Sequence, residues 1–171
     1  MLERMTISTG NAVRSRRLRD RGGLLMIVWG VSTGLLSVYW ATGGTVGLNQ
    51  LGIRIQEQAT ARESSFVAMI WLSTVARLAY AALGMALAQP WGEMLPRRIL
   101  LTLGWLGGGG LALYGLAGMA QAALVMASYI DTPVSMGHAA VPWYLLLWEP
   151  LWLIGGIAGL IATLGFQRST R

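Results

Sequence analysis

Four long apolar stretches dominate this chain and leave few ways for it to fold. Between 23 and 166, runs of about twenty or more mostly apolar residues are separated only by short polar segments. A bilayer core about 30 Å thick is crossed by roughly 20 apolar residues in an α-helix. Spans at 23–43, 66–88, 100–123 and 144–166 would use most of the 171 residues. The sequence therefore predicts an all-α fold, a four-helix transmembrane bundle.

The composition agrees with a membrane protein and excludes several other classes. Only 12% of the residues are charged, against about 25% in soluble domains. The chain has no cysteine and a single histidine, His138, so it lacks the residues for disulfides, thiolate chemistry or a multi-histidine metal or haem site. We expect no metal site, no cofactor and no catalytic residue, and the chain is more easily read as a non-enzyme.

The net charge of +6 comes from 13 arginines, and their distribution predicts the orientation. Ten lie in the N-terminal tail, the turn after the second span and the C-terminal tail. These ten are Arg4, Arg14, Arg16, Arg17, Arg19, Arg21, Arg97, Arg98, Arg168 and Arg171. The other two loops hold only Arg54 and Arg62. Because basic flanking residues stay in the cytoplasm, both termini are predicted to be cytoplasmic. Because these arginines lie beside apolar runs, we expect them to contact an anionic lipid surface and not nucleic acid.

Outside the membrane domain, 23–166, we expect little folded structure. Residues 1–22 are predicted to form a basic tail, disordered or lying on the membrane surface, and 167–171 a short second tail. The third apolar run, 99–130, would be roughly 48 Å long as a helix. We expect it to tilt or to run on outside the bilayer, with Gly107–Gly110 as a kink or close-packing point.

Glycines are expected to hold the helices together. Lipid tails are as apolar as leucine, so association depends on close backbone approach and polar contacts. Gly30 and Gly34, and likewise Gly155 and Gly159, are spaced to share one helical face. The simpler interpretation is packing within one chain. The alternative is an interface for a second copy of the chain or for a larger membrane complex.

Two ionisable residues lie inside predicted spans, where such groups are costly and usually functional. Arg77 lies near the middle of the second span, and Glu149 precedes Pro150 near the outer end of the fourth. Their similar depth predicts either an ion pair that orients the two spans or a polar pocket open to the outer side. In the pocket, Arg77 would bind an anionic head group or a quinone-like oxygen, and Glu149 would carry a proton. The candidate residues are Arg77, Glu149, Tyr80, Tyr39, Trp40 and Trp152.

Two motifs resemble a family of small bacterial membrane proteins, domain of unknown function 3995. Segment 38–47, V-Y-W-A-T-G-G-T-V-G, resembles the pattern Y-W-A-x-G-G-x-x-G at the end of the first span. Segment 147–156, L-W-E-P-L-W-L-I-G-G, resembles W-E-P-x-x-x-x-G-G in the last span. Within this segment the family usually has G-G-x-W-G, and Val46 replaces the tryptophan. The resemblance implies the four-span fold and a multi-pass protein of the bacterial inner (plasma) membrane, and it implies no activity.

Three functional hypotheses follow. The leading one is a non-enzymatic accessory subunit that packs against a larger membrane complex. The second is a lipid- or isoprenoid-handling enzyme with an outer-leaflet pocket, and the third is a small transporter. A cavity open to the outer leaflet would favour the small-molecule hypotheses over the first.

Overall fold

A computed structural model describes residues 2–170, with side chains from residue 14 onward. Four helical stretches are long and apolar enough to cross a membrane: Arg14–Ala41, Ser64–Ala88, Arg97–Met126 and His138–Ser169. No β-strand occurs in 2–170, so the all-α four-helix prediction is confirmed. Apolar side chains in the middle of these helices face outward, and Leu72, Leu106 and Leu113 are each 70% or more exposed. A large exposed apolar surface of this kind is stable in the hydrocarbon core of a membrane.

The first three of these stretches belong to continuous α-helices. They are α1 (Leu2–Ala41), α3 (Ser64–Ala88) and α4 (Arg97–Met126). The described part of the expected tail, 1–22, is helical, because α1 begins at Leu2 and has no break before the apolar run. Its role as a cytoplasmic tail remains a prediction. Arginine, leucine and methionine favour a helix. Packing also extends the helix, since Gly22 lies against the backbone of Ala162.

The fourth stretch is irregular before it becomes an α-helix. It begins with η3 (His138–Ala140) and α5 (Val141–Trp143), passes through a π-helical turn η4 (Tyr144–Trp148), and continues as α6 (Glu149–Ser169). In the π turn, the N–H of Glu149 donates to the carbonyl of Tyr144, five residues back. Pro150 has no N–H to offer the preceding turn, which explains why the regular hydrogen-bond ladder fails here.

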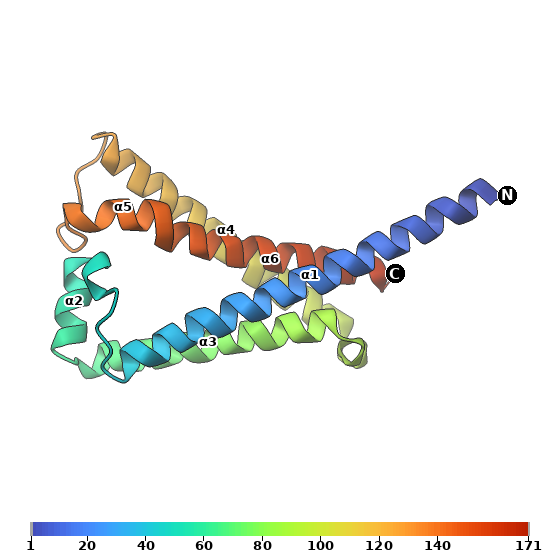
Figure 1. Ribbon diagram of the computed structural model, residues 1–171, viewed down its shortest axis with the longest axis horizontal. Coiled ribbons are helices and arrows are strands. Elements are labelled where there is room, and N and C mark those ends of the chain that lie inside the picture. The colour runs from blue at the N-terminus through green and yellow to red at the C-terminus, as the bar shows by residue number, and fades with distance from the viewer. Residues whose placement is uncertain (1, 171) are drawn as a thin grey trace.

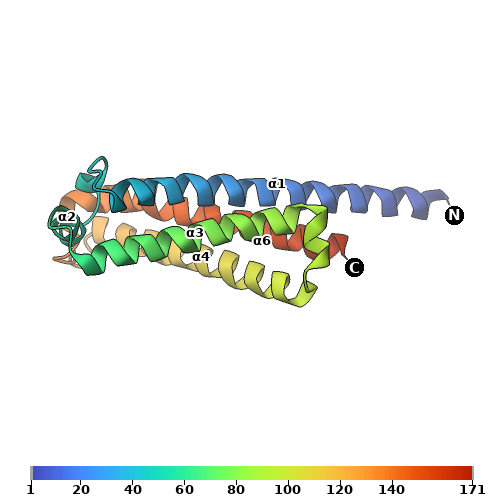
Figure 2. The same cartoon turned by 90° about the horizontal axis from the view of Figure 1, so that it is seen from below.

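The four helices form two arms that cross. Helix α1 packs along α3 in one arm, α4 packs along α6 in the other, and α1 joins the arms through α6. The arms converge near the C-terminus and diverge toward the opposite end (Figure 1). Seen at right angles, the helices run side by side, and both ends of the chain lie at the converging end (Figure 2).

The converging end contains the tightest packing. Met26, Leu87 and Phe166 are at most 1% exposed and belong to one cluster with residues of α4 and α6. Buried Arg19 lies among them: it donates to the carbonyls of Leu87 and Gln89, pairs with Glu93 in η2 (Pro90–Met94), and stacks over Phe166. A cation here ties the end of α3 to α1.

Glycines make the close helix contacts within the chain. A Cβ on Gly30 would meet the carbonyl of Arg77 at 2.6 Å, and one on Gly156 would meet the backbone of Ala112 at 2.3 Å. Within Gly107–Gly110, Gly108 packs on α6, whereas Gly109 and Gly110 have nothing within 4 Å, and α4 continues through them as one helix. The glycines thus act as close-packing points, and an additional interface remains a prediction.

The diverging end is bridged by the two loops. Helix α2 (Ile53–Thr60) follows η1 (Leu48–Gln50), and its first two residues, Ile53 and Arg54, donate backbone N–H groups to Met136 and Ser135 of the opposite arm. The indole of Trp148 also donates to the carbonyl of Gln50. These bridging hydrogen bonds hold the two arms at a fixed distance from each other. A space therefore remains between the arms.

Candidate functional site

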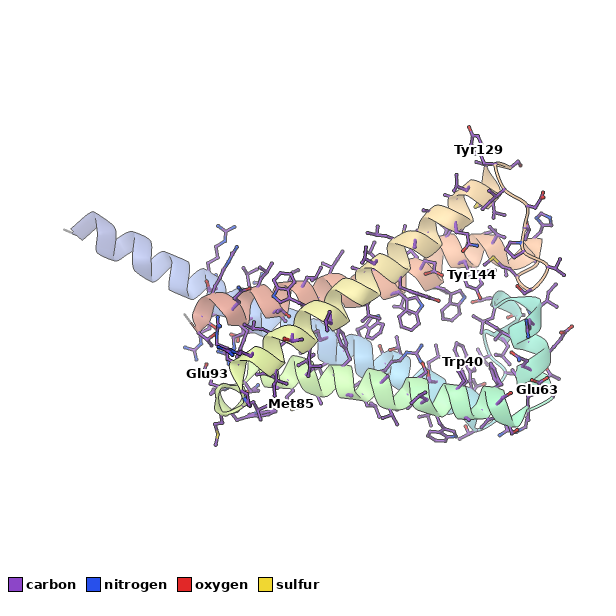
Figure 3. The ribbon with its side chains drawn as sticks, turned by 180° about the vertical axis from the view of Figure 1, so that it is seen from behind. Trp40, Glu63, Met85, Glu93, Tyr129 and Tyr144 are labelled. Atoms are coloured by element: carbon purple, nitrogen blue, oxygen red, sulfur yellow. The ribbon has the colours of Figure 1, made fainter. Side chains whose placement is uncertain are left out.

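A cavity of about 270 Å³ lies between the two arms. Every one of the four long helical stretches contributes to its wall, and Leu51 and Ile55 from the bridging loop close the wide end. Figure 3 shows Trp40 and Tyr144 on opposite sides of the gap between the arms. Most of the lining is apolar or aromatic. The polar groups on the wall include Thr33, Ser37, Ser73, Arg77, Tyr114, Tyr144 and Glu149.

Arg77 enters the cavity from the middle of α3. Its Nη1 donates a hydrogen bond to the hydroxyl of Ser37 on α1, and its Cζ lies 4.8 Å from the ring centroid of Trp152 on α6. A guanidinium over an indole face gains cation–π attraction in a low-dielectric place. The Nε of Arg77 is buried and has no hydrogen-bond partner. The cation is thus held by both arms and still has a donor to give.

Glu149 faces the cavity from the other arm. Only 5% of the residue is exposed, and its Oε2 has no hydrogen-bond partner. The carboxyl group fits against Gly118 of α4, where any Cβ would lie 2.2 Å from the Glu149 Cδ. An unpaired buried polar group is costly, and functional sites are where proteins retain such groups.

The predicted ion pair between Arg77 and Glu149 is not formed. Among the side chains of 14–170, the ion pair within 4 Å is Arg19–Glu93, at 2.6 Å. Arg77 is turned toward Ser37 and Trp152, while the π turn directs Glu149 toward α4. The two residues line one cavity without joining. The alternative prediction, a shared polar pocket, matches their positions better.

Tyr114 of α4 interacts electrostatically with both Arg77 and Glu149. Its ring packs edge-on against Trp152, with the centroids 5.5 Å apart, and Trp152 lies at the same 5.5 Å from Trp29. An aromatic wall therefore runs beside the two ionisable groups.

The other candidate residues divide between the cavity and its surroundings. Trp40 lines the cavity and pairs with Trp148 at 5.7 Å. Tyr80 is outside it, in an adjoining hollow, where its hydroxyl donates to the carbonyl of Gly155 and joins α3 to α6. Tyr39 is 40% exposed, and its hydroxyl accepts the N–H of Val46 in the loop. Tyr80 and Tyr39 are thus placed as packing and loop residues.

Sequence reasoning missed several wall residues. Ser37, Tyr114 and Tyr144 were not among the candidates, and each carries a hydroxyl on the cavity wall. Ser37 and Ser73 lie at about the same depth in the membrane as Arg77. This shared depth is the one sequence signal that could have identified them as wall residues. Nothing in a glycine-rich apolar run distinguishes Tyr114 from a lipid-facing tyrosine.

Residues 30–159 match the model of the family described as Protein of unknown function (DUF3995). The chain belongs to this family. The comparisons found no match for it among curated proteins or among solved structures. The DUF3995 region contains Arg77, Tyr114, Gly118 and Glu149, whereas the Arg19 contacts begin outside it. Apart from Trp29, the residues that line the cavity lie within the DUF3995 region.

The exposure of the lining residues indicates which side of the DUF3995 cavity is covered and which is not. At the wide end, Leu51 is buried and Trp40, Ile55 and Trp148 are half-buried, so this end is covered. Two lining residues, Met69 on α3 and Tyr114 on α4, are 54% and 58% exposed. Both lie within membrane-crossing helices. These exposures favour an entrance between α3 and α4, on the side of the membrane-crossing helices. Among the described residues, no three His, Asp or Glu side chains gather as metal ligands.

Proposed function

We propose that this DUF3995 protein binds a small lipid-soluble molecule within the bacterial plasma membrane. One observation carries the proposal: two residues that line the cavity, Arg77 and Glu149, each keep a buried polar atom without a partner, Arg77 Nε and Glu149 Oε2. Ligand sites are typically apolar hollows with a few convergent polar groups. Such a molecule would enter sideways and satisfy the polar groups that the protein leaves unpaired.

The proposal includes the orientation. Arg16, Arg97, Arg98 and Arg168 belong to the converging end or its turns, near both termini, and Arg54 and Arg62 belong to the bridged end. The positive-inside rule supports a cytoplasmic converging end. The wide part of the cavity then lies in the outer leaflet.

Small-molecule binding is preferred here over the accessory-subunit hypothesis. A pure packing module gains nothing from an unpaired guanidinium nitrogen and an unpaired carboxyl oxygen, because each buried polar group without a partner lowers stability. Binding is the step shared by the lipid-handling enzyme and the transporter. Our proposal is restricted to this shared step.

The test is to identify what the protein carries out of the membrane. The chain is purified in a mild detergent, and the small molecules that co-purify are quantified by mass spectrometry. We expect a lipid-soluble species enriched on the unmodified chain and lost from Arg77→Gln. Arg98→Gln, a change at an exposed arginine, is the matched control and should keep the species. Identical extracts from all three proteins would refute the proposal.

A further inference from the structure

The cavity's size and lining narrow the class of molecule that it can hold. A volume of about 270 Å³ lies just below the usual range of roughly 300–1,000 Å³ for ligand pockets. It has room for a compact head group, and the adjoining hollow of about 370 Å³ shares Arg77 and Trp152 with it. The chains of a lipid would extend beyond this space. Chains must therefore pass out between Met69 and Tyr114 into the bilayer.

The polar groups on the wall argue against a phosphate. Phosphate recognition uses several donors and often bidentate arginine contacts. Arg77 is the only basic residue lining this cavity, and its Nη1 is already bonded to Ser37. A phosphate would also be placed near the Glu149 carboxyl with no further cation to balance it.

A flat ring with oxygen atoms at opposite ends fits better. Trp152 and Tyr114 offer aromatic faces and edges beside the cavity, and aromatic rings gain from offset or edge-on packing. Arg77 has an unused N–H donor on one side. The Glu149 carboxyl accepts a hydrogen bond when ionised and donates one when protonated, so it can serve a hydroxyl or a carbonyl.

From this arrangement we infer that the cavity binds the ring of a quinone or hydroquinone that carries a hydrophobic tail. One ring oxygen accepts from Arg77, and the opposite oxygen bonds to Glu149. The tail leaves between α3 and α4. The inference rests on the proposed function and adds the chemical class of its ligand. It concerns binding alone, without electron transfer.

The ring oxygens can be tested one at a time. The full chain in lipid nanodiscs is titrated, without oxygen, with a prenylated 1,4-naphthohydroquinone and with the matching prenylated 1-naphthol, which lacks the second hydroxyl. Quenching of tryptophan fluorescence reports binding, since Trp29, Trp40, Trp148 and Trp152 line the cavity. We expect one saturable site per chain and about tenfold weaker binding of the naphthol, the order expected for one hydrogen bond to a charged group.

Variants assign each oxygen to its residue. Glu149→Leu should bind both compounds equally, because it has no polar partner for the second hydroxyl, while Glu149→Gln should keep the discrimination. Arg77→Gln should weaken both compounds. Glu57→Gln and Arg98→Gln, at exposed positions, are the controls and should behave as the unmodified chain. If Glu149→Leu fails to fold, Gly118→Ala displaces the same carboxyl group and gives the same readout.

Three results would overturn the inference. Equal binding of both compounds by the unmodified chain would show that Glu149 does not recognise a second oxygen. Failure of both compounds to bind, while another species still co-purifies in an Arg77-dependent manner, would exclude the ring and leave the proposed function standing. If both compounds fail to bind and no species co-purifies in an Arg77-dependent manner, the inference and the proposed function are both refuted.

Discussion

The carboxyl group of Glu149 on α6 occupies the space that a side chain at Gly118 on α4 would take. A Cβ at position 118 would lie 2.2 Å from the Glu149 Cδ and 2.3 Å from its Oε2. The contact fixes the carboxyl group at the cavity wall, although the two residues lie on different helices. The absence of a side chain at 118 is therefore part of the site.

Gly118→Ala should separate binding from folding. The displaced group is the flexible end of a side chain, so the helices need not move, and alanine also favours the helix by about 1 kcal/mol over glycine. We expect a melting temperature near that of the unmodified chain and a smaller amount of the co-purifying molecule. Gly110→Ala, with nothing within 4 Å of the new methyl group, should retain both. Normal binding by Gly118→Ala would show that the contact between Gly118 and the Glu149 carboxyl is not needed for binding.

Gly156→Ala should instead destabilise the fold. Its Cβ would meet the backbone nitrogen of Ala112 at 2.3 Å and the Ala112 Cα at 2.7 Å, and backbone atoms cannot turn aside. Helices α4 and α6 must then separate. Thermal unfolding in detergent should show a loss of about 1–3 kcal/mol, the usual cost of overpacking. Gly109→Ala, on the open side of α4, provides the comparison, and equal stability of the two variants would contradict the packing described here.

Removing the Arg19 side chain should destabilise the fold more than removing its ion-pair partner Glu93. Arg19→Gln removes the side-chain donor of the buried Leu87 carbonyl, at a cost of about 1–3 kcal/mol. The Gln89 carbonyl also loses Arg19 but still accepts the N–H of Gly92. Glu93 is 54% exposed on its side chain, so Glu93→Gln should cost less than about 1 kcal/mol. Chemical unfolding of both variants checks the order, and the reverse order would contradict it.

The orientation can be checked with single cysteines, because the chain has none of its own. Ser135→Cys, in the bridged end, should react with a membrane-impermeant maleimide in intact cells. Gln167→Cys, near the C-terminus, should react only after the cells are opened. The opposite pattern would mean that the arginines do not set the topology of this protein.

Much of the fold could be predicted, because hydrophobic length and turn residues are local properties. The four apolar runs each contain a long helix, and Arg77 and Glu149 stand out as costly charges. Rotation about each helix axis could not be predicted. Spans that are apolar on every side carry no amphipathic signal for their facing residues. That is why the ion pair was expected and why Tyr114 was missed.

Two other differences have local causes that only packing reveals. The sequence shows Pro150 in the last span, and the structure adds a π turn just before it, beside which Glu149 lies against α4. The arginine-rich start resembled a free tail, yet Arg19 is buried against Phe166 and helix α1 runs through it. In both places the sequence located the feature and tertiary contacts decided its geometry.

A spin label in the cavity tests the central claim most directly. Ser73 lines the cavity wall, so a nitroxide attached to Ser73→Cys reports what reaches the space between the arms. In lipid nanodiscs, we predict strong relaxation by oxygen, which dissolves in hydrocarbon, and little by a water-soluble nickel chelate. Strong relaxation by the chelate would mean that the cavity opens to water, and protection from both would mean that it is sealed. Either result would contradict a site entered from the bilayer.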